Sequence, residues 1–511
     1  MREKYSLCMN KACRILLVLA LAACLGRGVA AQPYDRIERR NFWNAGRNIN
    51  GLRTDSVSIS FAQLQGGYES GGLRDSYMAP EGWSAGAEAR TIMHLQKLSM
   101  KGAFSFVNFS GKDMCGSMSG RPGYYPVDIL EFTPGGKTRQ TYSFEGGITA
   151  DLSGRWRLGG EIMFTSENYT KRKDLRHTNY LLDMTVAPSV MYHNGDFAAG
   201  LSYIFRKSSE TVTAEVLGIS SGSYYAFLDK GLMRGVYDIW DSQGTHLSET
   251  GVSGFPAKEL SHGAALQLQW RSLYAELEYL RSEGSMGEKQ NIWFRFPADR
   301  FAVRAGWSSG KGPIRHFIRA EAGMEDRRNY ESVMESDTQD GVTVTTVYGK
   351  NRIMHSRRFS AAPEYEVTAP GWEFRAGARL ESSGEQASPV YPYLYFRRIF
   401  TGEGYAEALV KIWKFDLGGS IAFRQGTFSD TESLADSGMS APQEPYYMEE
   451  YDSMHMEYIT APRLSAGMSL RFNFWKGLYA EAAGHYAHGF SLRHLDGPDR
   501  WEGSLGIGYT F

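Results

Sequence analysis

The sequence predicts an all-β protein that forms one transmembrane, antiparallel, up-and-down β-barrel. Three observations lead to this prediction. Apolar and polar residues alternate from residue 57 to residue 511 without a domain-separating linker, short connections alternate with long ones, and tryptophans gather beside the short connections. Transmembrane helices are excluded, because no apolar run of about 20 residues exists beyond the N-terminus.

The alternation is clearest in two hairpins and in the last strand. Residues 141–152 and 156–165 form one predicted hairpin, and a second hairpin turns at Asn194-Gly195. The terminal strand 501–511 places Trp501, Leu505, Ile507, Tyr509 and Phe511 on one face. Such a bare apolar edge would promote aggregation of a soluble protein, whereas lipid covers it in a closed barrel.

The connections alternate in length in the manner of outer-membrane barrels, which have short periplasmic turns and long external loops. Short turns are expected at 96–97, 153–154, 193–196, 271–272, 369–371, 413–414 and 475–477. Long loops are expected near 110–137, 208–260, 326–356 and 426–456. The length asymmetry therefore predicts which end of the barrel faces the periplasm.

Strand number follows from the requirement that both chain ends lie in the periplasm, because an even number of strands is then needed. Residues 290–308 are therefore interpreted as one strand bent at Pro297, and residues 389–412 as one strand bent near Gly402. This gives about eighteen strands, with sixteen as the near alternative.

Tryptophans mark the periplasmic rim. Six of the eleven tryptophans stand beside short turns, which is typical of the aromatic girdle at a membrane interface. They are Trp156, Trp270, Trp307, Trp372, Trp413 and Trp475.

The opposite face of the strands carries charges of both signs, which a water-filled lumen tolerates and lipid does not. The candidates for lining the lumen are Glu88, Arg90, Glu145, Arg157, Glu161, Arg206, Arg319, Glu321, Glu373, Arg375 and Arg379. Together they would set the electrostatics of a pore. The alternative is a ladder of ion pairs that only solvates and braces the wall.

The N-terminus predicts export. Residues 1–31 have the basic start, apolar run and Ala-Ala junction of a signal peptide, with cleavage expected after Ala31. The alternative is a lipobox, Leu21-Ala22-Ala23-Cys24, which would leave Cys24 lipidated. Residues 32–56 follow as a polar, basic segment that lies either in the periplasm or in the lumen, and the barrel is expected over 57–511.

Two further segments invite a functional interpretation. Loop 208–260 is rich in aromatic residues, which predicts packing on itself, in the lumen or against a partner. Residues 448–457 bring thioether, imidazole and carboxylate groups together, but without a recognisable ligand spacing. An ordinary loop is the expected structure there, followed by a strand at 458–473, and no metal site or cofactor is predicted.

Enzymatic activity is not predicted, because no serine and histidine occupy neighbouring same-face positions near a rim. His246-Leu247-Ser248 lies in a loop, Phe490 occupies the place where a serine would be needed near His488, and His316 faces lipid without an apparent partner. The net charge of −1 gives no indication of a nucleic-acid partner.

The chain resembles outer-membrane β-barrels of the Bacteroidota, on its Ala30-Ala31-Gln32 junction and its ending in Tyr509-Thr510-Phe511. Within that group it is similar to a family of this length with no assigned activity. The resemblance implies that Tyr509 and Phe511 belong to the signal by which the barrel-assembly machinery recognises the strand. It implies nothing about a substrate.

Two functional hypotheses remain for a protein in the bacterial outer membrane. The first is a porin-like channel or transport component for a small solute. The second is a non-conducting barrel, plugged by residues 32–56 or by loop 208–260, that docks a surface or periplasmic protein.

Overall fold

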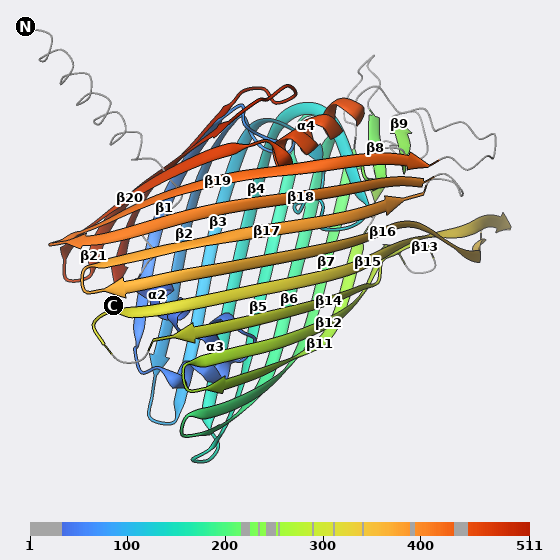
Figure 1. Cartoon of the computed structure of the whole chain (residues 1–511). Helices are drawn as coiled ribbons and strands as arrows, with labels where there is room; N and C mark the ends of the chain where they lie inside the picture. Colours follow the sequence, from blue (N-terminus) through green and yellow to red (C-terminus); the bar gives the residue numbers. More distant parts are fainter. Residues whose placement is uncertain are drawn as a thin grey trace, which may run out of the picture.

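The wall of the molecule is a single antiparallel sheet that closes on itself (Figure 1). The computed structural model describes residues 33–215, 225–233, 236–241, 252–253, 256–288, 291–309, 312–339, 342–388, 394–433 and 448–511. The predicted signal peptide, residues 1–31, lies outside these described residues, and so does Cys24. Closure occurs where β1 (Ile59–Gly71) pairs with β22 (Asp499–Thr510), with Leu64 opposite Ile507.

The other strands follow one another around the wall with short connections at one end. The first half contains β2 (Glu81–His94), β3 (Leu98–Ser117), β4 (Asp128–Asp151), β5 (Trp156–Lys171), β6 (Arg176–Asn194), β7 (Phe197–Glu215), β11 (Ala257–Trp270), β12 (Leu273–Glu288) and β14 (Ala298–Ser308). The second half contains β15 (Arg315–Gln339), β16 (Val342–Ala369), β17 (Trp372–Ala387), β18 (Leu394–Ile412), β19 (Phe415–Ser433), β20 (Arg463–Trp475) and β21 (Leu478–Gly489).

Short strands and helices complete the described chain. The short strands are β8 (Tyr225–Gly231), β9 (Val236–Asp241), β10 (Val252–Ser253) and β13 (Asn291–Arg295). The helices are α2 (Pro33–Arg40), α3 (Phe42–Ala45), the 3-10 helix η1 (Ile49–Thr54) and α4 (Met448–Thr460). None of these described helices is long and apolar enough to cross a membrane.

The prediction of eighteen strands is confirmed for the wall that the described residues form. β13 and β14 both pair with β12 and β15, so they are two parts of one wall strand interrupted at Pro297, as the sequence predicts. Proline causes the break because it has no N–H for the ladder. β18 keeps an unbroken register with both neighbours through Gly402, so no interruption occurs there.

The outer face of the wall is apolar. Phe144, Leu277 and Leu505 are each at least half exposed and point away from the lumen. This arrangement fits a bilayer, where lipid covers the apolar side chains and the closed ladder satisfies the backbone. The barrel therefore belongs in the bacterial outer membrane, as predicted. All six predicted girdle tryptophans are exposed beside short turns, with Trp413 the most exposed at 82%.

The external end departs most from the sequence prediction. The expected loop 326–356 is instead largely strand: β15 and β16 pair up to Gln339 and Val342, with two shifts of register, and extend far beyond the length needed to cross a bilayer. The expected loops 110–137 and 426–456 are also shorter than predicted, because β3, β4 and β19 continue into them. Residues 448–460 form helix α4 rather than a loop and the start of a strand, and β20 begins only at Arg463.

The last residue completes the seam of the barrel. The Phe511 N–H donates a hydrogen bond of 2.8 Å to the Ser60 carbonyl, and the Phe511 ring meets Tyr509 edge to face. Recognition of Tyr509 and Phe511 by the assembly machinery stays a prediction.

The apolar belt provides a direct test of how the barrel sits in lipid. We expect Leu505→Arg to lower the free energy of unfolding in phospholipid vesicles by about 2–4 kcal/mol, because a charge enters the hydrocarbon. The matched control is Leu152→Arg, since Leu152 is equally exposed, at 69% against 70%, but lies beyond the end of β4. Denaturant titration followed by tryptophan fluorescence measures both, and equal losses would contradict this placement of the bilayer.

Candidate functional site

The lumen contains all the charged residues that the sequence singles out. The eleven predicted residues lie on the inner face, and each has an ion-pair partner. Glu88 and Arg90 pair directly at 2.6 Å. The partners of the others are Lys101 for Glu145 and Glu161, Asp151 for Arg157, Asp183 for Arg206, Glu364 for Arg319, Arg304 for Glu321, Arg36 for Glu373, Glu407 for Arg375 and Glu403 for Arg379.

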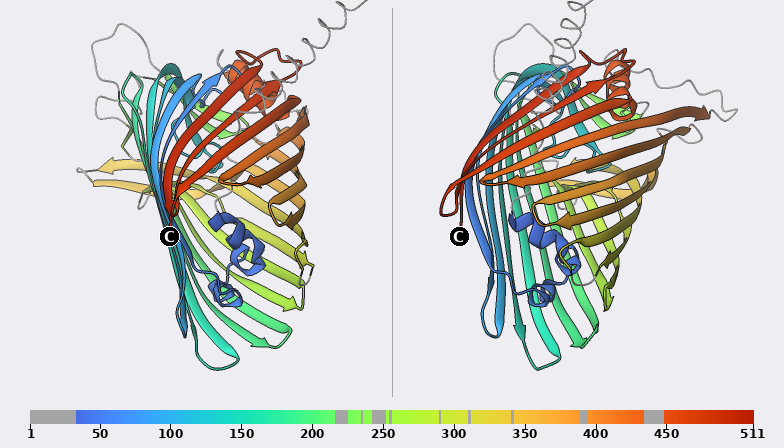
Figure 2. Two further views of the ribbon diagram at one scale, coloured as in Figure 1. Left: turned by 90° about the vertical axis from the view of Figure 1, so that its left-hand side faces the viewer. Right: turned by 60° about the vertical axis from the view of Figure 1, so that its left-hand side comes forward.

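The N-terminal segment lies inside the barrel, toward the end with the short turns (Figure 2). We call residues 33–56 the N-terminal plug. Helix α2 presents three arginines to one side of the wall, where Arg36 pairs with Glu373 at 3.0 Å and Arg40 pairs with the same carboxylate at 2.9 Å. Arg39 lies 3.3 Å from Glu366, which is almost completely buried.

The opposite side of α2 is acidic and meets basic residues of the wall. The Asp35 carboxylate lies 3.1 Å from the guanidinium of Arg90, and Glu38 lies 2.6 Å from the ammonium group of Lys101. The short helix is thus held between an acidic wall region and a basic one. This division of charge fixes its orientation in the lumen.

The plug also packs against the wall through apolar side chains and against glycines of the wall strands. Trp43 is 2% exposed, and its indole N–H donates to the side chain of Gln269. A Cβ atom added at Gly159 would come within 2.5 Å of Ile49, and one at Gly306 within 2.8 Å of Phe42. These wall positions need glycine because the plug lies directly against the backbone. The alternation in the sequence shows that these glycines lie on the inner face, but it does not show that a segment of the chain packs against them.

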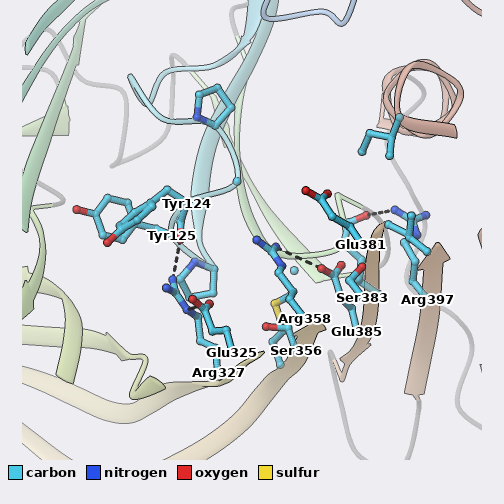
Figure 3. A pocket seen from close by; sticks show the side chains of 18 of the residues that line it. Tyr124, Tyr125, Glu325, Arg327, Ser356, Arg358, Glu381, Ser383, Glu385 and Arg397 are labelled. Carbon is cyan, nitrogen blue, oxygen red and sulfur yellow. Dashed lines mark hydrogen bonds and ion pairs between the residues drawn. The ribbon is translucent and has the colours of Figure 1, made fainter. Parts of the chain in front are cut away.

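Two adjoining cavities lie between the plug and the external end of the lumen. Their volumes are about 700 Å³ and about 550 Å³, within the range of small-molecule sites. They share the lining residues Tyr124, Glu278, Arg300, Glu325, Arg327 and Arg358. Figure 3 shows the larger cavity, with Tyr124 and Tyr125 on one side and Glu381, Glu385 and Arg397 on the other.

A segment between β3 and β4 enters the lumen and carries Tyr124 into an arginine cluster. The guanidinium of Arg121 stacks 3.9 Å from the centre of the Tyr124 ring, and those of Arg206 and Arg327 approach the same ring at 5.4 and 5.6 Å. The Tyr124 hydroxyl donates a 2.9 Å hydrogen bond to Glu259. Nothing in the sequence pattern brings residue 124 to β7 and β15.

Glu259 is the anionic centre of this cluster. Its carboxylate is almost completely buried and lies 3.2 Å from Arg300, 3.5 Å from Arg327 and 3.9 Å from Arg206. One buried carboxylate therefore contacts three guanidinium groups that line the cavities; Arg300 and Arg327 also pair with Glu325, and Arg206 with Asp183. A small polar solute entering there meets guanidinium, carboxylate, phenol and hydroxyl groups at once.

Two carboxylates line the larger cavity without an arginine opposite them. Asp128 on β4 is directly opposite Asp229 on β8, beyond the membrane-spanning part of the wall. Burial raises the pKa of each carboxyl to about 7. With a pKa of about 7, each carboxyl is therefore partly protonated at neutral pH.

Helix α4 closes part of the external end and is tied down by ion pairs. Arg397 donates two hydrogen bonds of 2.7 Å to Asp452, and the same guanidinium also binds Asp430. His455 pairs with the buried carboxylate of Asp75. The Tyr451 ring stacks on Phe132 at 3.9 Å.

The structure describes only part of the other sequence segments for which a function was considered. In the predicted loop 208–260, β7 continues to Glu215 and β8 pairs with β4, so Phe227 and Leu228 become buried. Among the described residues, no group of three or more His, Cys, Asp or Glu could hold a metal ion. His246 and Ser248 lie outside the described residues. His316 hydrogen-bonds to Tyr365 at 2.7 Å, which corrects the prediction that it has no partner.

A comparison with models of protein families identifies the family of the chain. Residues 51–511 match a family of unknown function, DUF6850. The chain belongs to this family. A comparison with curated protein sequences finds no significant match.

Solved structures with a similar course of the chain include a siderophore receptor, an outer-membrane transporter and an iron transporter. The siderophore receptor PiuA of Acinetobacter baumannii is 7% identical, with a TM-score of 0.39 and coverage of 89% of this chain and 82% of that one. The Escherichia coli transporter YddB is 7% identical, with a TM-score of 0.42 and coverage of 88% and 81%. The FrpB iron transporter of Neisseria meningitidis (F3-3 variant) is 11% identical, with a TM-score of 0.38 and coverage of 90% and 82%.

The His455 contact predicts a pH-dependent attachment of α4. Burial by itself lowers the pKa of His455, but the hydrogen bond and charge of Asp75, with the charge of Asp452, outweigh burial and the opposing charge of Arg397, so the pKa is raised. A raised pKa means that the contact stabilises fully below the unfolded value of about 6.5 and is lost as pH rises through the folded value.

We therefore expect amide protection in residues 448–460, corrected for intrinsic exchange, to fall as the pH rises above the unfolded value of about 6.5. Hydrogen exchange followed by mass spectrometry measures this change. His455→Gln removes the titrating group, so its protection is expected to be lower at acidic pH and flat across the range. The same pH dependence in the variant would contradict the assignment.

Proposed function

We propose that the protein is a gated outer-membrane transport channel for a small polar solute, closed at its periplasmic end by the N-terminal plug. The observation that carries this proposal is the nature of the plug contacts. A wall that is complete without the plug holds one side of a short segment by ion pairs at helix α2 and the other by buried apolar side chains such as Trp43 and Leu52, and solute-sized cavities adjoin it.

The ion pairs support a plug that leaves and returns. Desolvation of charges offsets much of their mutual attraction, so such contacts provide orientation with a modest net stabilisation. The wall does not depend on them, because β1 and β22 close the sheet through backbone pairing. Displacement of residues 33–56 therefore leaves the barrel folded and opens the periplasmic half of the lumen.

The cavities support passage of a small solute rather than a protein or a nucleic acid. Their lining offers guanidinium groups from Arg300, Arg327 and Arg358 together with the carboxylates of Glu325 and Glu381. Such a mixed lining suits a polar or zwitterionic molecule, because each charge of the solute finds an opposite partner.

Conductance measurements test the gating role of the plug. We expect Arg36→Gln combined with Arg40→Gln to raise the open probability in planar bilayers at least about tenfold, which corresponds to about 1.4 kcal/mol of lost plug binding. The control combines Arg379→Gln with Arg424→Gln, since the described neighbours of these two wall arginines, such as Glu403 for both, lie outside the plug. The control is expected to remain as closed as the unmodified protein.

Deletion of residues 33–56 provides the decisive comparison for the same proposal. A deletion variant that is folded, by its heat-modifiable migration on gels, is expected to conduct continuously. A folded variant that never conducts or transports would overturn the channel function.

A second candidate, docking of a surface protein, is favoured by the β15–β16 hairpin. β17 ends at Ala387 opposite Met354, so the outer edge of β16 before Met354 has no wall strand beside it in the described residues. Val344, Val347 and Tyr348 near the tip are each more than half exposed. A free edge with apolar side chains accepts an added strand from another protein.

Shortening the hairpin separates the two candidates. We expect replacement of residues 333–348 by Asn-Gly to abolish cross-linking of a surface partner to this region if docking is the function. Conductance of the shortened barrel with the deleted plug is expected to remain unchanged. A partner set that is the same before and after shortening would argue against docking at the hairpin.

A further inference from the structure

Basic side chains gather on the outside of the barrel, where the external extension begins. They lie on β13, β15, β16 and β18, and we call this region the basic face. Its members are Arg295, Arg328, Lys350, Arg352, Arg357 and Arg398, with His355 among them.

The strand register places these residues together on the outer side. Arg328 is opposite His355, while Arg295 and Arg352 are both opposite Tyr330. Residues directly opposite one another in a ladder point to the same face. Arg357 is two residues from Phe359, which points into the lipid belt, so both side chains lie on the outer face.

The basic face adjoins the apolar belt directly. Phe359 and Phe400, each 50% exposed, follow Arg357 and Arg398 two positions later on their strands, with one inner-facing residue between. Both arginines lie on the external side of these phenylalanines, because the short turns are at the other end. The positive charges therefore stand at the height of the outer-leaflet headgroups.

The charge of the basic face is poorly neutralised by the protein itself. Within the basic face the register places the carboxylate of Asp326; Asp299 lies directly opposite it on β14 and pairs with Arg281 at 2.7 Å. Asp326 lies 2.7 Å from Arg357, 3.3 Å from Arg328 and 3.1 Å from His355, so three groups share one anion. The guanidinium side chains nevertheless remain 57% and 44% exposed. The chain as a whole has a net charge of −1, so this excess of positive charge is local.

Room for a ligand exists beside the arginines. Gly384 lies between Arg357 and Arg398 in the register, and a Cβ atom built at Gly384 would find no atom within 4 Å. Farther out, a hollow of about 340 Å³ is lined by Arg295, Tyr330 and Lys350, among others. Open space thus lies beside these side chains, of which Lys350 stacks on the Tyr330 ring at 4.6 Å.

We propose that the basic face binds the phosphate groups of an anionic lipid of the outer leaflet. Guanidinium groups bind phosphate through two parallel hydrogen bonds, and anionic headgroups are attracted to basic residues beside a membrane. The adjoining phenylalanines would pack against the acyl chains of the same lipid. This continuity with the apolar belt selects a lipid over a soluble anion, and the proposal holds whether or not the barrel conducts.

Lipid retention by the purified, folded protein in a zwitterionic detergent tests the proposal. Native mass spectrometry would record binding of diphosphorylated lipid A and of its dephosphorylated form. We expect Arg357→Gln combined with Arg398→Gln to weaken binding of the phosphorylated lipid about 30-fold, from the known effect of two basic residues near a membrane surface. Gly384→Glu is expected to weaken it similarly, since it places a negative charge in the open space between the two arginines.

The matched control combines Lys207→Gln with Lys258→Gln, which removes two exposed basic residues from the outer face of β7 and β11. This control is expected to bind phosphorylated lipid as the unmodified protein does. Equal weakening in the control, or unchanged binding in the Arg357/Arg398 variant, would overturn the proposal. Competition by inorganic pyrophosphate at the lipid concentration would also overturn it, because the site would then recognise a soluble anion.

Discussion

Satisfaction of the backbone in lipid is the constraint on which the rest of this structure depends. Hydrocarbon offers no hydrogen-bond partner, so every strand of the wall needs a neighbour on both sides. The pairing of β1 with β22 meets this requirement, and the hydrogen bond from Phe511 to Ser60 extends it to the end of the chain. Closure also forces alternate side chains to opposite environments, one face in lipid and the other around a lumen.

The separation of apolar and polar side chains determines what fills the lumen. Charged residues excluded from lipid accumulate inside, where they must be paired because the space is narrow and partly filled. Glu373 binds arginines of the plug, whereas Glu259 binds arginines that line the cavities. The same class of interaction thus braces the wall, orients the plug and defines the chemistry that a solute would meet. The ion pairs that orient the plug thus follow from the polarity that the bilayer imposes on the wall.

The external end of the barrel lies in water. There, strands need neither alternate apolar and polar side chains nor a neighbouring strand on both sides. Its apolar core gathers side chains from the segment before β4, from β8 and from β13, including Val127, Leu228 and Phe294. Helix α4 and the β15–β16 hairpin belong to this region as well. The sequence of β15 and β16 beyond the membrane has a strand-like pattern. A loop and a projecting hairpin would both connect the two wall strands on the external side, so the order of strands does not distinguish them. Strand parity therefore predicted the side of residues 326–356 and not their structure.

Sequence alone determined the closed barrel and its eighteen strands, whereas the orientation in the membrane and the lumen-lining role of the charged residues stay predictions. Each of these depends on a period of two and on local signals such as Pro297 and the turn-flanking tryptophans, which act within a few residues. Only the tertiary structure decided that the plug lies against Gly159 and Gly306, that Tyr124 reaches Glu259, and that Arg357 and Arg398 flank Gly384. The reason is that these contacts join positions whose distance in space depends on closure of the whole wall. A pattern along the chain records which face a side chain takes, but not what lies opposite it across the lumen.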